Sequence, residues 1–419
     1  MNDRTMENIK KEKKHSLPQG WKIKKLSEIG NVFNGNSINA KIKKEKYLGL
    51  DNGLPYIGTK DIGFDSIIDY ENGVKIPLTE KELFKIAPKN TPLICVEGGS
   101  AGRKIGFTNQ DVCFGNKLFA LVPNKSVNSR FLFYYYFSSS FQIHFSNEMT
   151  GIIGGVSMSK FKSIEIPLPP LPEQQRIVAI LDETFSAIDK AKANAEQNLK
   201  NAKELFESYL QGVFEKQGDG WEVKCLDELG AITSSKRIYK SEYVKDGVPF
   251  YRTKEIKELS NGKPITLELF ISKDRYEQIK KSFGVPQIGD LLMSAVGTIG
   301  EIMVIENEDE FYFKDGNIVW FKDFQRLDTN YLKYALTAFV EKIKSLAIGA
   351  AYSALTIEKL NKYEITFPKT KEEQQTIVRQ LDTLRIETQK LESIYQKKIL
   401  LLEELKKSIL QKAFSGELN

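Results

Sequence analysis

Few residues in this chain could carry acid–base, nucleophilic or metal chemistry. The sequence has two histidines, of which His15 lies in a basic leader and His144 lies beside aromatic residues. Its three cysteines, Cys95, Cys113 and Cys225, are widely separated and form no C-x-x-C pair. A metal site needs several such ligands in one place, and a catalytic triad needs a nucleophile beside a base. The sequence therefore predicts no catalytic residue and no metal site in this chain.

Two motifs that could have a chemical meaning fail on spacing. The stretch Gly98-Gly-Ser-Ala-Gly-Arg-Lys104 has the residue types of a phosphate-binding loop, but it lacks the G-x-x-x-x-G-K-[ST] spacing. The stretch Leu168-Pro-Pro-Leu171 lacks the polar residue and the aromatic of the Asn-Pro-Pro-Tyr motif that amino-methyltransferases use. We therefore expect neither a nucleotide site nor methyl transfer by this chain.

What the sequence does offer is a set of polar and basic residues in glycine-containing loops. Such side chains suit contacts to base edges and to phosphates, and they occur at equivalent places in two halves of the chain. Taken singly, each could equally cap a turn. The predicted nucleic-acid contacts are Asn36, Ser37, Thr59, Lys60, Ser100, Arg103, Lys104, Asn116 and Lys117 in the first half, and Ser234, Ser235, Lys236, Arg237, Arg252, Thr253, Lys254, Ser294, Thr298 and Asn317 in the second.

Two other clusters permit a structural interpretation. The aromatic run from Phe131 to Phe137 could stack on unpaired bases, but its helical spacing favours a place in the core. The run Lys41-Ile-Lys-Lys-Glu-Lys46 is equally compatible with a solvated surface and with a phosphate clamp.

The elements that position these loops are duplicated, with an offset of about 200 residues. Gly20-Trp-Lys-Ile-Lys-Lys-Leu-Ser-Glu-Ile-Gly30 matches Gly220-Trp-Glu-Val-Lys-Cys-Leu-Asp-Glu-Leu-Gly230 in its glycines, tryptophan and central leucine. Other matching segments begin at Leu54 and Val248, at Leu93 and Leu292, at Ser129 and Thr329, and at Lys203 and Glu403. The chain is predicted to be a tandem repeat of a globular part followed by a helical part.

Each globular part is predicted to be α+β. Short apolar runs punctuated by glycine and proline are typical of strands and turns, and they include Ile164–Leu168, Gly289–Ser294 and Asn317–Phe321. Helices are expected to begin near Asn128 and near Asp328. The predicted boundaries are a polar leader at 1–16, globular domains at 17–170 and 217–369, and long helices at 171–216 and 370–416.

Each helical part is predicted to be one long helix, because roughly forty residues after Pro172 and after Thr370 contain no proline and almost no glycine. Thr370 with Glu373 fits a capping box, and proline is tolerated in the first helical turn. Both helices carry an apolar stripe in steps of three and four. Its main members are Ile177, Leu181, Ile188, Leu205, Ile377, Leu381, Leu384, Leu391, Leu402, Leu405 and Ile409.

At about 1.5 Å per residue, each helix is roughly 60 Å long, which is too long for its stripe to be buried on one small domain. The two stripes are therefore predicted to pack together as an intramolecular antiparallel coiled coil. An antiparallel register that opposes small and large side chains pairs Ile177 with Ile409, Ala195 with Leu391, and Ala202 with Leu384. Ile188 opposite Lys398 is the weakest point of that register.

Length and composition fit this picture. At about 150 residues per domain, 419 residues suggest two or three domains. The net charge of +6 is compatible with nucleic acid but too small to argue for it. The apolar runs fall short of the roughly 20 residues that cross a bilayer, and no apolar signal segment opens the chain, so we expect no membrane association and a cytoplasmic location.

The duplicated Gly-Trp-x-x-x-x-Leu-x-Glu-x-Gly opening, the linker Pro167-Leu-Pro-Pro-Leu-Pro-Glu-Gln-Gln-Arg-Ile-Val178 and the long helix after each copy resemble the specificity subunit of type I restriction-modification systems. The resemblance covers nearly the whole chain. It implies that each globular part is a target recognition domain for one half of a split site in double-stranded DNA. It also implies that the paired helices hold the two domains apart and dock two methyltransferase (modification) subunits.

Catalysis would then belong to the partners. The resemblance implies S-adenosylmethionine as the methyl donor of the modification subunits, with adenine N6 as acceptor, and ATP and Mg in a restriction subunit where one is present. No cofactor is expected on this chain. Because the two copies differ in their loops, with Arg103 and Lys104 in one and Glu301 in the other, the target is expected to be asymmetric.

The helices set a limit on the target. A coil of about 60 Å restricts the half-sites to centres no more than roughly 18 base pairs apart at about 3.4 Å each. Apolar residues outside the stripe, such as Phe185, Phe206, Ile386 and Ile394, are expected to receive the partners.

Two alternatives remain at this stage. A scaffold of two protein-binding modules on a coiled coil explains the repeat equally well, but it leaves the linker motif as coincidence and predicts no salt-sensitive DNA binding. A self-sufficient methyltransferase or nuclease is disfavoured by the missing catalytic motifs.

Overall fold

The computed structural model describes residues 17–151, 154–215, 218, 220–346 and 355–418. It divides into two compact units, which are Met1–Asn194 with Lys398–Asn419, and Ala195–Lys397. Each unit therefore contains one globular domain and a part of each long helix. The predicted leader at 1–16 and its His15 lie outside the described residues.

The globular domain of unit 1 contains two four-stranded sheets, of order β2-β9-β6-β7 and β4-β3-β8-β5, and a ribbon of β1 with β10. Its strands are β1 (Lys22–Lys25), β2 (Gly30–Asn34), β3 (Leu54–Ile57), β4 (Lys75–Ile76), β5 (Ile86–Ala87), β6 (Pro92–Cys95), β7 (Ile105–Phe107), β8 (Val112–Phe114), β9 (Leu118–Pro123) and β10 (Glu165–Leu168). Its helices are α2 (Leu26–Ile29), α3 (Ala40–Ile42), α4 (Ser129–Tyr135), α5 (Ser139–Glu148) and α6 (Met158–Ser163).

The globular domain of unit 2 has the sheet orders β12-β19-β16-β17 and β13-β15-β14-β18, and a ribbon of β11 with β20. Its strands are β11 (Trp221–Cys225), β12 (Ala231–Thr233), β13 (Tyr243–Val244), β14 (Val248–Tyr251), β15 (Phe270–Ile271), β16 (Leu291–Ser294), β17 (Ile302–Val304), β18 (Tyr312–Phe313), β19 (Ile318–Lys322) and β20 (Glu364–Pro368). Its helices are α8 (Leu226–Leu229), α9 (Thr253–Ser260), α10 (Lys273–Phe283), α11 (Thr329–Leu346) and α12 (Ile357–Asn361).

The two domains share the topology of their first sheet, as the repeat predicts, while their second sheets differ in the edge strand, which is β5 beside β8 in unit 1 and β13 beside β15 in unit 2. The order β2-β9-β6-β7 corresponds strand by strand to β12-β19-β16-β17, and each domain has one parallel pair, β3 with β8 and β14 with β18. The predicted helix starts are confirmed, because the Asn128 and Asp328 side chains accept from the first backbone N–H groups of α4 and α11. The α+β tandem repeat is thus confirmed.

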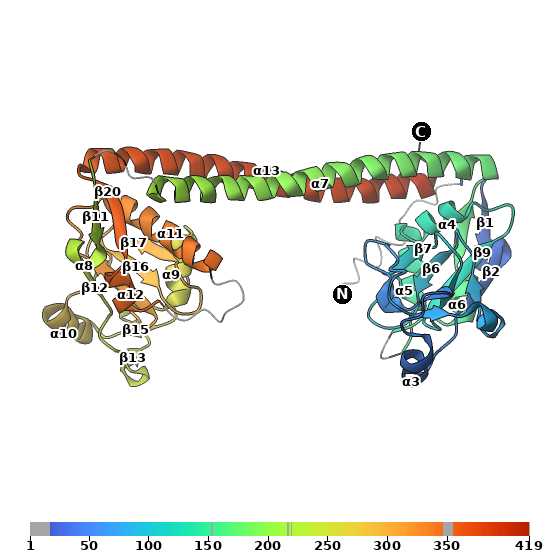
Figure 1. The fold of residues 1–419 in the computed structure, drawn as a ribbon, viewed down its shortest axis with the longest axis horizontal. Coiled ribbons are helices and arrows are strands. Elements are labelled where there is room, and N and C mark those ends of the chain that lie inside the picture. Colours follow the sequence, from blue (N-terminus) through green and yellow to red (C-terminus); the bar gives the residue numbers. More distant parts are fainter. Residues whose placement is uncertain (1–16, 152–153, 216–217, 219, 347–354, 419) are drawn as a thin grey trace. The chain divides into compact units, whose positions relative to one another are not determined.

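The two long helices are α7 (Leu171–Glu215) and α13 (Lys371–Ser415). The Thr370 hydroxyl accepts from the Glu373 backbone N–H at 3.4 Å, and Gly416 ends α13 with a φ of 78° that favours glycine. In Figure 1, α13 begins beside β11 and β20 of unit 2. Within the described residues, no helix has both the length and the apolar content that a membrane span needs.

The helices pack antiparallel within each unit. In unit 1, Lys406 bonds to Asp189 at 2.8 Å, and three residues further along α7 Lys192 bonds to Glu403 at 2.6 Å. In unit 2, the Tyr209 hydroxyl on α7 lies 3.5 Å from Gln380 on α13. Residue numbers therefore rise along one helix as they fall along the other, and the antiparallel coiled coil is confirmed.

A contact between a cation on α13 and an aromatic ring on α7 occurs once in each unit, with the two residue types exchanged between equivalent positions of the repeat. In unit 1, the Lys406 ammonium on α13 lies 4.8 Å from the ring centre of Phe185 on α7. In unit 2, the Arg385 guanidinium on α13 lies 5.9 Å from the ring of Phe206 on α7. Position 185 corresponds to position 385 in the repeat, and position 206 to position 406. The same cation–aromatic contact is therefore made twice, with the aromatic always on α7.

This contact and the ion pairs show that the predicted register is wrong. Pairing Ile177 with Ile409 would place Asp189 opposite Lys397, but its partner is Lys406, roughly two and a half turns away. The prediction weighed only side-chain sizes along the helices. It could not include the globular domain, where α13 ends with Phe414 packed 5.1 Å from the ring of Phe131 on α4.

The same packing changes the apolar stripe. Leu205, Leu391 and Leu405 were predicted at the helix interface but are exposed, whereas Leu210 and Leu410 are buried. Near the end of each helix, the buried face thus turns toward the globular domain. The other predicted members Ile177, Leu181, Ile188 and Leu381 are buried, and Ile377, Leu384, Leu402 and Ile409 are half-buried. Phe185, expected to be an exposed docking residue, is also buried, because it packs on Tyr134.

A buried glutamine fixes each long helix to its own domain. The Gln174 amide donates to the carbonyls of Pro169 and Ser126, and its oxygen accepts from the Asn128 backbone N–H at 2.8 Å. Gln374 repeats all three bonds in unit 2, with its oxygen accepting from the Asp328 backbone N–H at 2.7 Å. The repeated Glu-Gln-Gln motif thus places each helix against the loop that precedes α4 or α11.

A second repeated contact lies two turns further along. Asp182 on α7 accepts hydrogen bonds from the Tyr134 hydroxyl and from Arg130, and Asp382 on α13 accepts from the Tyr334 hydroxyl at 2.6 Å. Burial raises the pKa of both tyrosines, and the bond to aspartate raises it further, so the hydroxyls remain donors at neutral pH. The aromatic run from Phe131 to Phe137 therefore belongs to the core and to this helix contact.

Candidate nucleic-acid interface

In unit 1, predicted contact residues from two loops meet at an exposed phenylalanine. Lys104 donates to the carbonyl of Thr59 at 3.0 Å, although 45 positions separate them in the chain. The Arg103 guanidinium lies 4.9 Å and the Lys104 ammonium 5.3 Å from the ring centre of Phe64, which is 61% exposed. We call Thr59, Phe64, Arg103 and Lys104 the Phe64 cluster. Two cations over an exposed ring suit both phosphates and base faces.

The glycine-rich stretch 98–104 is the turn that positions this cluster. It joins β6 to β7, and the Gly102 N–H donates to the carbonyl of Cys95 at 2.8 Å. Gly102 has a φ of 71°, and a Cβ there would lie 2.8 Å from the Phe145 ring. A nucleotide phosphate loop leads from a strand into a helix, whereas this turn leads into a strand. The glycines therefore serve the turn geometry.

In the lysine run at 41–46, Lys41 and Lys46 lie near carboxylates, whereas Lys43 contacts an aromatic ring. Lys46 pairs with Glu80 at 2.9 Å, and Lys41 lies 4.0 Å from Glu45. Lys43 instead lies 4.7 Å from the ring centre of Tyr56. Burial lowers the pKa of Lys43, Asp61 raises it, and Lys60 lowers it further. Lys43 therefore lies over the Tyr56 ring on β3, and the turn Thr59–Asp61 that carries the predicted contacts Thr59 and Lys60 follows this strand.

Other predicted contacts of unit 1 have structural roles or stand apart. The Asn36 side chain accepts from the Lys85 backbone N–H at 2.7 Å, which ties two loops together. Lys117 pairs with Glu97 at 2.7 Å. Ser37 and Asn116 are exposed, and Ser100 is half-buried within the 98–104 turn. The structure thus brings Thr59, Arg103 and Lys104 together and leaves these residues outside the Phe64 cluster.

In unit 2, the predicted cations Arg252 and Lys254 surround a carboxylate. Glu268 lies 2.7 Å from Arg252 and 2.6 Å from Lys254, one oxygen to each. Arg252 also bonds to the buried Glu255 at 2.6 Å. The hydrogen bonds from Lys254 and Arg252 lower the pKa of Glu268 to about 2. We call Arg252, Lys254, Glu255 and Glu268 the Glu268 network, and Thr253 lies within it at the start of α9.

Lys236 and Arg237 lie in a neighbouring loop of unit 2. The Lys236 ammonium lies 5.0 Å from the ring centre of Phe283, which is 53% exposed, and Arg237 pairs with Asp315 at 2.7 Å. An exposed aromatic under a cation therefore occurs in both units. Phe64 and Phe283 were not among the contacts predicted from sequence, although an isolated aromatic in a polar stretch is a signal that could have identified them.

The prediction that Ser294 contacts DNA is wrong, because this residue is fully buried and cannot reach DNA in this fold. Its hydroxyl donates to the carbonyl of Thr298 and accepts from the Glu301 N–H at 3.0 Å, so it holds the turn after β16. Ser234 likewise accepts from the Gly316 N–H at 3.2 Å. The Ser235 hydroxyl is buried without a partner in the described part of the chain, Asn317 is half-buried, and only Thr298 of this group is exposed.

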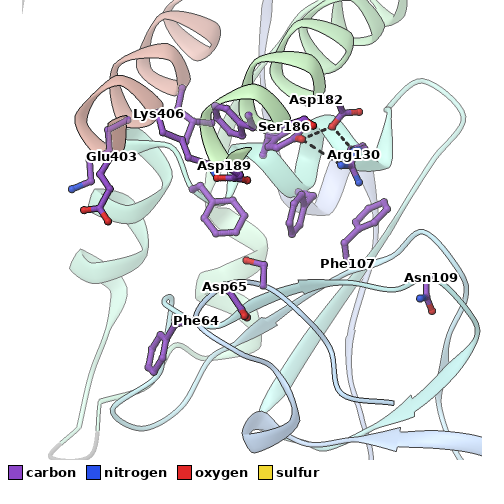
Figure 2. A pocket seen from close by; sticks show the side chains of 17 residues that line it. Phe64, Asp65, Phe107, Asn109, Arg130, Asp182, Ser186, Asp189, Glu403 and Lys406 are labelled. Carbon is purple, nitrogen blue, oxygen red and sulfur yellow. Dashed lines mark hydrogen bonds and ion pairs between the residues drawn. The ribbon is translucent and has the colours of Figure 1, made fainter. Parts of the chain in front are cut away.

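Unit 1 also contains a cavity of about 850 Å³ between the globular domain and the two helices. Figure 2 shows Phe64 and Asp65 on one side of it, Arg130 with its bond to Asp182 on another, and Asp189 and Lys406 from the helices. Its carboxylates Asp182 and Asp189 are both engaged by cations. The cavity connects the Phe64 cluster with the helix pair.

The structure offers no alternative chemical centre in the residues it describes. His144 is exposed on α5, and no group of three or more His, Cys, Asp or Glu side chains in this part of the chain could hold a metal ion. Burial raises the pKa of the Cys113 thiol to about 11, so it stays protonated at neutral pH and is a poor nucleophile.

Comparison with known proteins identifies relatives over the whole length. The family model described as the type I restriction modification DNA specificity domain matches residues 18–200 and again 218–400. A putative type I restriction enzyme specificity subunit of Haemophilus influenzae, S.HindORF215P, is 27% identical over 361 residues, covering 84% of this chain and 85% of that protein. The MjaIX specificity subunit of Methanocaldococcus jannaschii is 28% identical over 443 residues, covering 96% and 94%.

Solved structures show the same fold. A chain from a study of complex assembly and conformational transition of the type I R-M system matches with a TM-score of 0.74 and 19% identity, over 96% of this chain and all of that one. The HsdS subunit from Thermoanaerobacter tengcongensis matches with a TM-score of 0.63 and 20% identity, over 97% of this chain and all of that one.

Proposed function

The chain belongs to the family defined by the type I restriction modification DNA specificity domain, and we propose that it is the specificity subunit of such a complex. In this role, each globular domain reads one half of a two-part target in double-stranded DNA. The observation that carries the proposal is the occurrence of the family's domain twice, at 18–200 and 218–400. A scaffold without DNA is disfavoured because it leaves that match unexplained.

Catalysis is assigned to partner subunits. Two modification subunits bind the paired helices and transfer the methyl group of S-adenosylmethionine to adenine N6, and a restriction subunit, where present, uses ATP and Mg. Exposed apolar side chains on the helices support docking there, since such groups mark protein contacts. Leu205, Ile386, Ile394 and Leu401 are each more than half exposed. Because the target is cellular DNA, we place the chain in the cytoplasm.

The two half-sites are proposed to differ. The turn after β6 carries Arg103 and Lys104 at an exposed ring, whereas the equivalent turn after β16 carries Glu301. A basic loop and an acidic loop present different partners to base edges, because arginine donates to guanine while a carboxylate accepts from cytosine. The target is therefore asymmetric, and the helices determine the gap between its halves.

Methyl transfer by purified subunits tests the proposal. The chain together with its modification subunits should methylate adenine in duplexes of one motif, and the chain alone should transfer no methyl group. Modification subunits without the chain should lose that sequence preference. Unchanged preference without the chain would overturn the proposal, and methyl transfer by the chain alone would instead make it an enzyme.

A further inference from the structure

In the Glu268 network, the Glu268 carboxylate occupies the place between two cations where an anionic ligand could bind. Each oxygen of Glu268 receives one cation, with Arg252 at 2.7 Å and Lys254 at 2.6 Å. Both cations stand at the start of α9, where the helix dipole also favours an anion. All three side chains remain partly exposed, with 30% for Arg252, 59% for Lys254 and 44% for Glu268. An anion from solution can therefore reach the place that Glu268 occupies.

A second carboxylate, Glu255, holds the site in shape independently of Glu268. It is buried, it accepts from the Arg252 backbone N–H at 2.8 Å, and it bonds to the Arg252 guanidinium at 2.6 Å. Because Glu255 belongs to α9 itself, Arg252 keeps its orientation when Glu268 moves away. Glu268 comes from the segment before β15 and touches the site only through its exposed end.

The equivalent loop of unit 1 keeps the lysine but has neither the arginine nor this carboxylate, because Gly58 stands in the place of Arg252. The Gly58 N–H donates to Asp61 at 2.8 Å, as the Arg252 N–H donates to Glu255, and Lys60 corresponds to Lys254. Within the described residues, the only carboxylate near Lys60 is Asp61 at 3.9 Å, and the Lys60 side chain is 74% exposed. One copy thus presents its lysine openly, and the other covers it with Glu268.

We infer that Arg252 and Lys254 form a phosphate-binding pair that Glu268 occupies in the DNA-free chain, and that a backbone phosphate of the target replaces this carboxylate on binding. The inference rests on the proposed function. A phosphate has the charge and the paired oxygens that these two cations already bind. Unit 1 then makes its phosphate contact through Lys60 without displacing a carboxylate, while unit 2 makes its contact only after Glu268 has moved away.

Glu268→Gln in the full chain, assembled with its modification subunits, tests the exchange. We expect binding to a duplex carrying the methylated motif to tighten by about 3- to 10-fold at low salt. The uncharged side chain no longer competes with a DNA phosphate for Arg252 and Lys254, and an exposed ion pair of this kind is weak. The plot of log affinity against log salt should steepen by up to about 1, because in the wild type the freed Glu268 carboxylate takes up a cation on DNA binding and so offsets one released counterion.

Glu222→Gln is the matched control, because it removes the same charge from an exposed ion pair, Glu222 with Arg326 at 2.7 Å. Glu222 lies on β11 beside the long helices, away from β15 in Figure 1. Lys254→Gln should weaken binding, and in that background Glu268→Gln should have a much smaller effect.

Three outcomes would overturn the inference. Glu268→Gln could bind DNA as the wild type or the Glu222→Gln control does, with the same salt dependence. Alternatively, its effect could persist undiminished in the Lys254→Gln background. If the wild-type complex bound no DNA at all, the proposed function would fail as well, so the two failures are distinguishable.

Discussion

At the scale of single residues, two buried glutamines explain why the Glu-Gln-Gln motif occurs at the start of both long helices. Gln174 and Gln374 are both fully buried, and each satisfies its whole amide with three backbone groups. Their neighbours Gln175 and Gln375 are exposed. A buried polar side chain persists only when it is hydrogen-bonded, and here the bonds join the start of a helix to a loop of its domain. The first glutamine of each pair is therefore a structural residue.

Gln174→Ala should lower the free energy of unfolding of unit 1 by about 2–4 kcal/mol, because it removes three hydrogen bonds of a fully buried side chain and leaves the Pro169 carbonyl buried without this partner. Gln175→Ala, which removes the same side chain one position later, should change it by less than about 0.5 kcal/mol. Chemical denaturation of both variants measures the difference. Equal stabilities would contradict the role given to Gln174.

At the scale of elements, the long helices show which structural features can be predicted from the sequence and which cannot. Their existence, their antiparallel pairing and the starts of α4 and α11 were predictable, because periodicity, capping residues and proline are local signals. The register was not, since Phe414 and Leu410 pack against the globular domain and rotate the buried face away from Leu405. The Glu268 network was equally out of reach, because no local pattern connects Glu268 with Arg252 and Lys254.

Two leucines five positions apart on α7 test the corrected helix face. Leu210→Ala should lower the free energy of unfolding by about 2–4 kcal/mol, because Leu210 is 1% exposed in the core of unit 2. Leu205→Ala should change it little, because Leu205 is 51% exposed. In the assembled complex, however, Leu205→Ala should weaken the association with modification subunits. A large loss of stability in Leu205→Ala alone would restore the register predicted from sequence.

At the scale of the whole molecule, we propose that the helices set the distance between the half-sites and that the two domains read them. Deleting seven residues from α7 and the seven paired with them in α13 shortens each helix by about 10 Å and keeps the apolar repeat in phase. The preferred gap between half-sites should then shrink by about 3 base pairs at about 3.4 Å each, while both half-site sequences stay the same. A gap that does not change would remove the helices from that role.

The most direct test is a map of modified bases in a host that carries the modification genes with or without the gene for this chain. We predict gene-dependent methylation of adenine at one motif, made of two unlike specified stretches separated by a fixed unspecified gap. An identical map in the absence of the gene, or a single palindromic motif in its presence, would contradict the claim that two different domains of this chain each read half of the target.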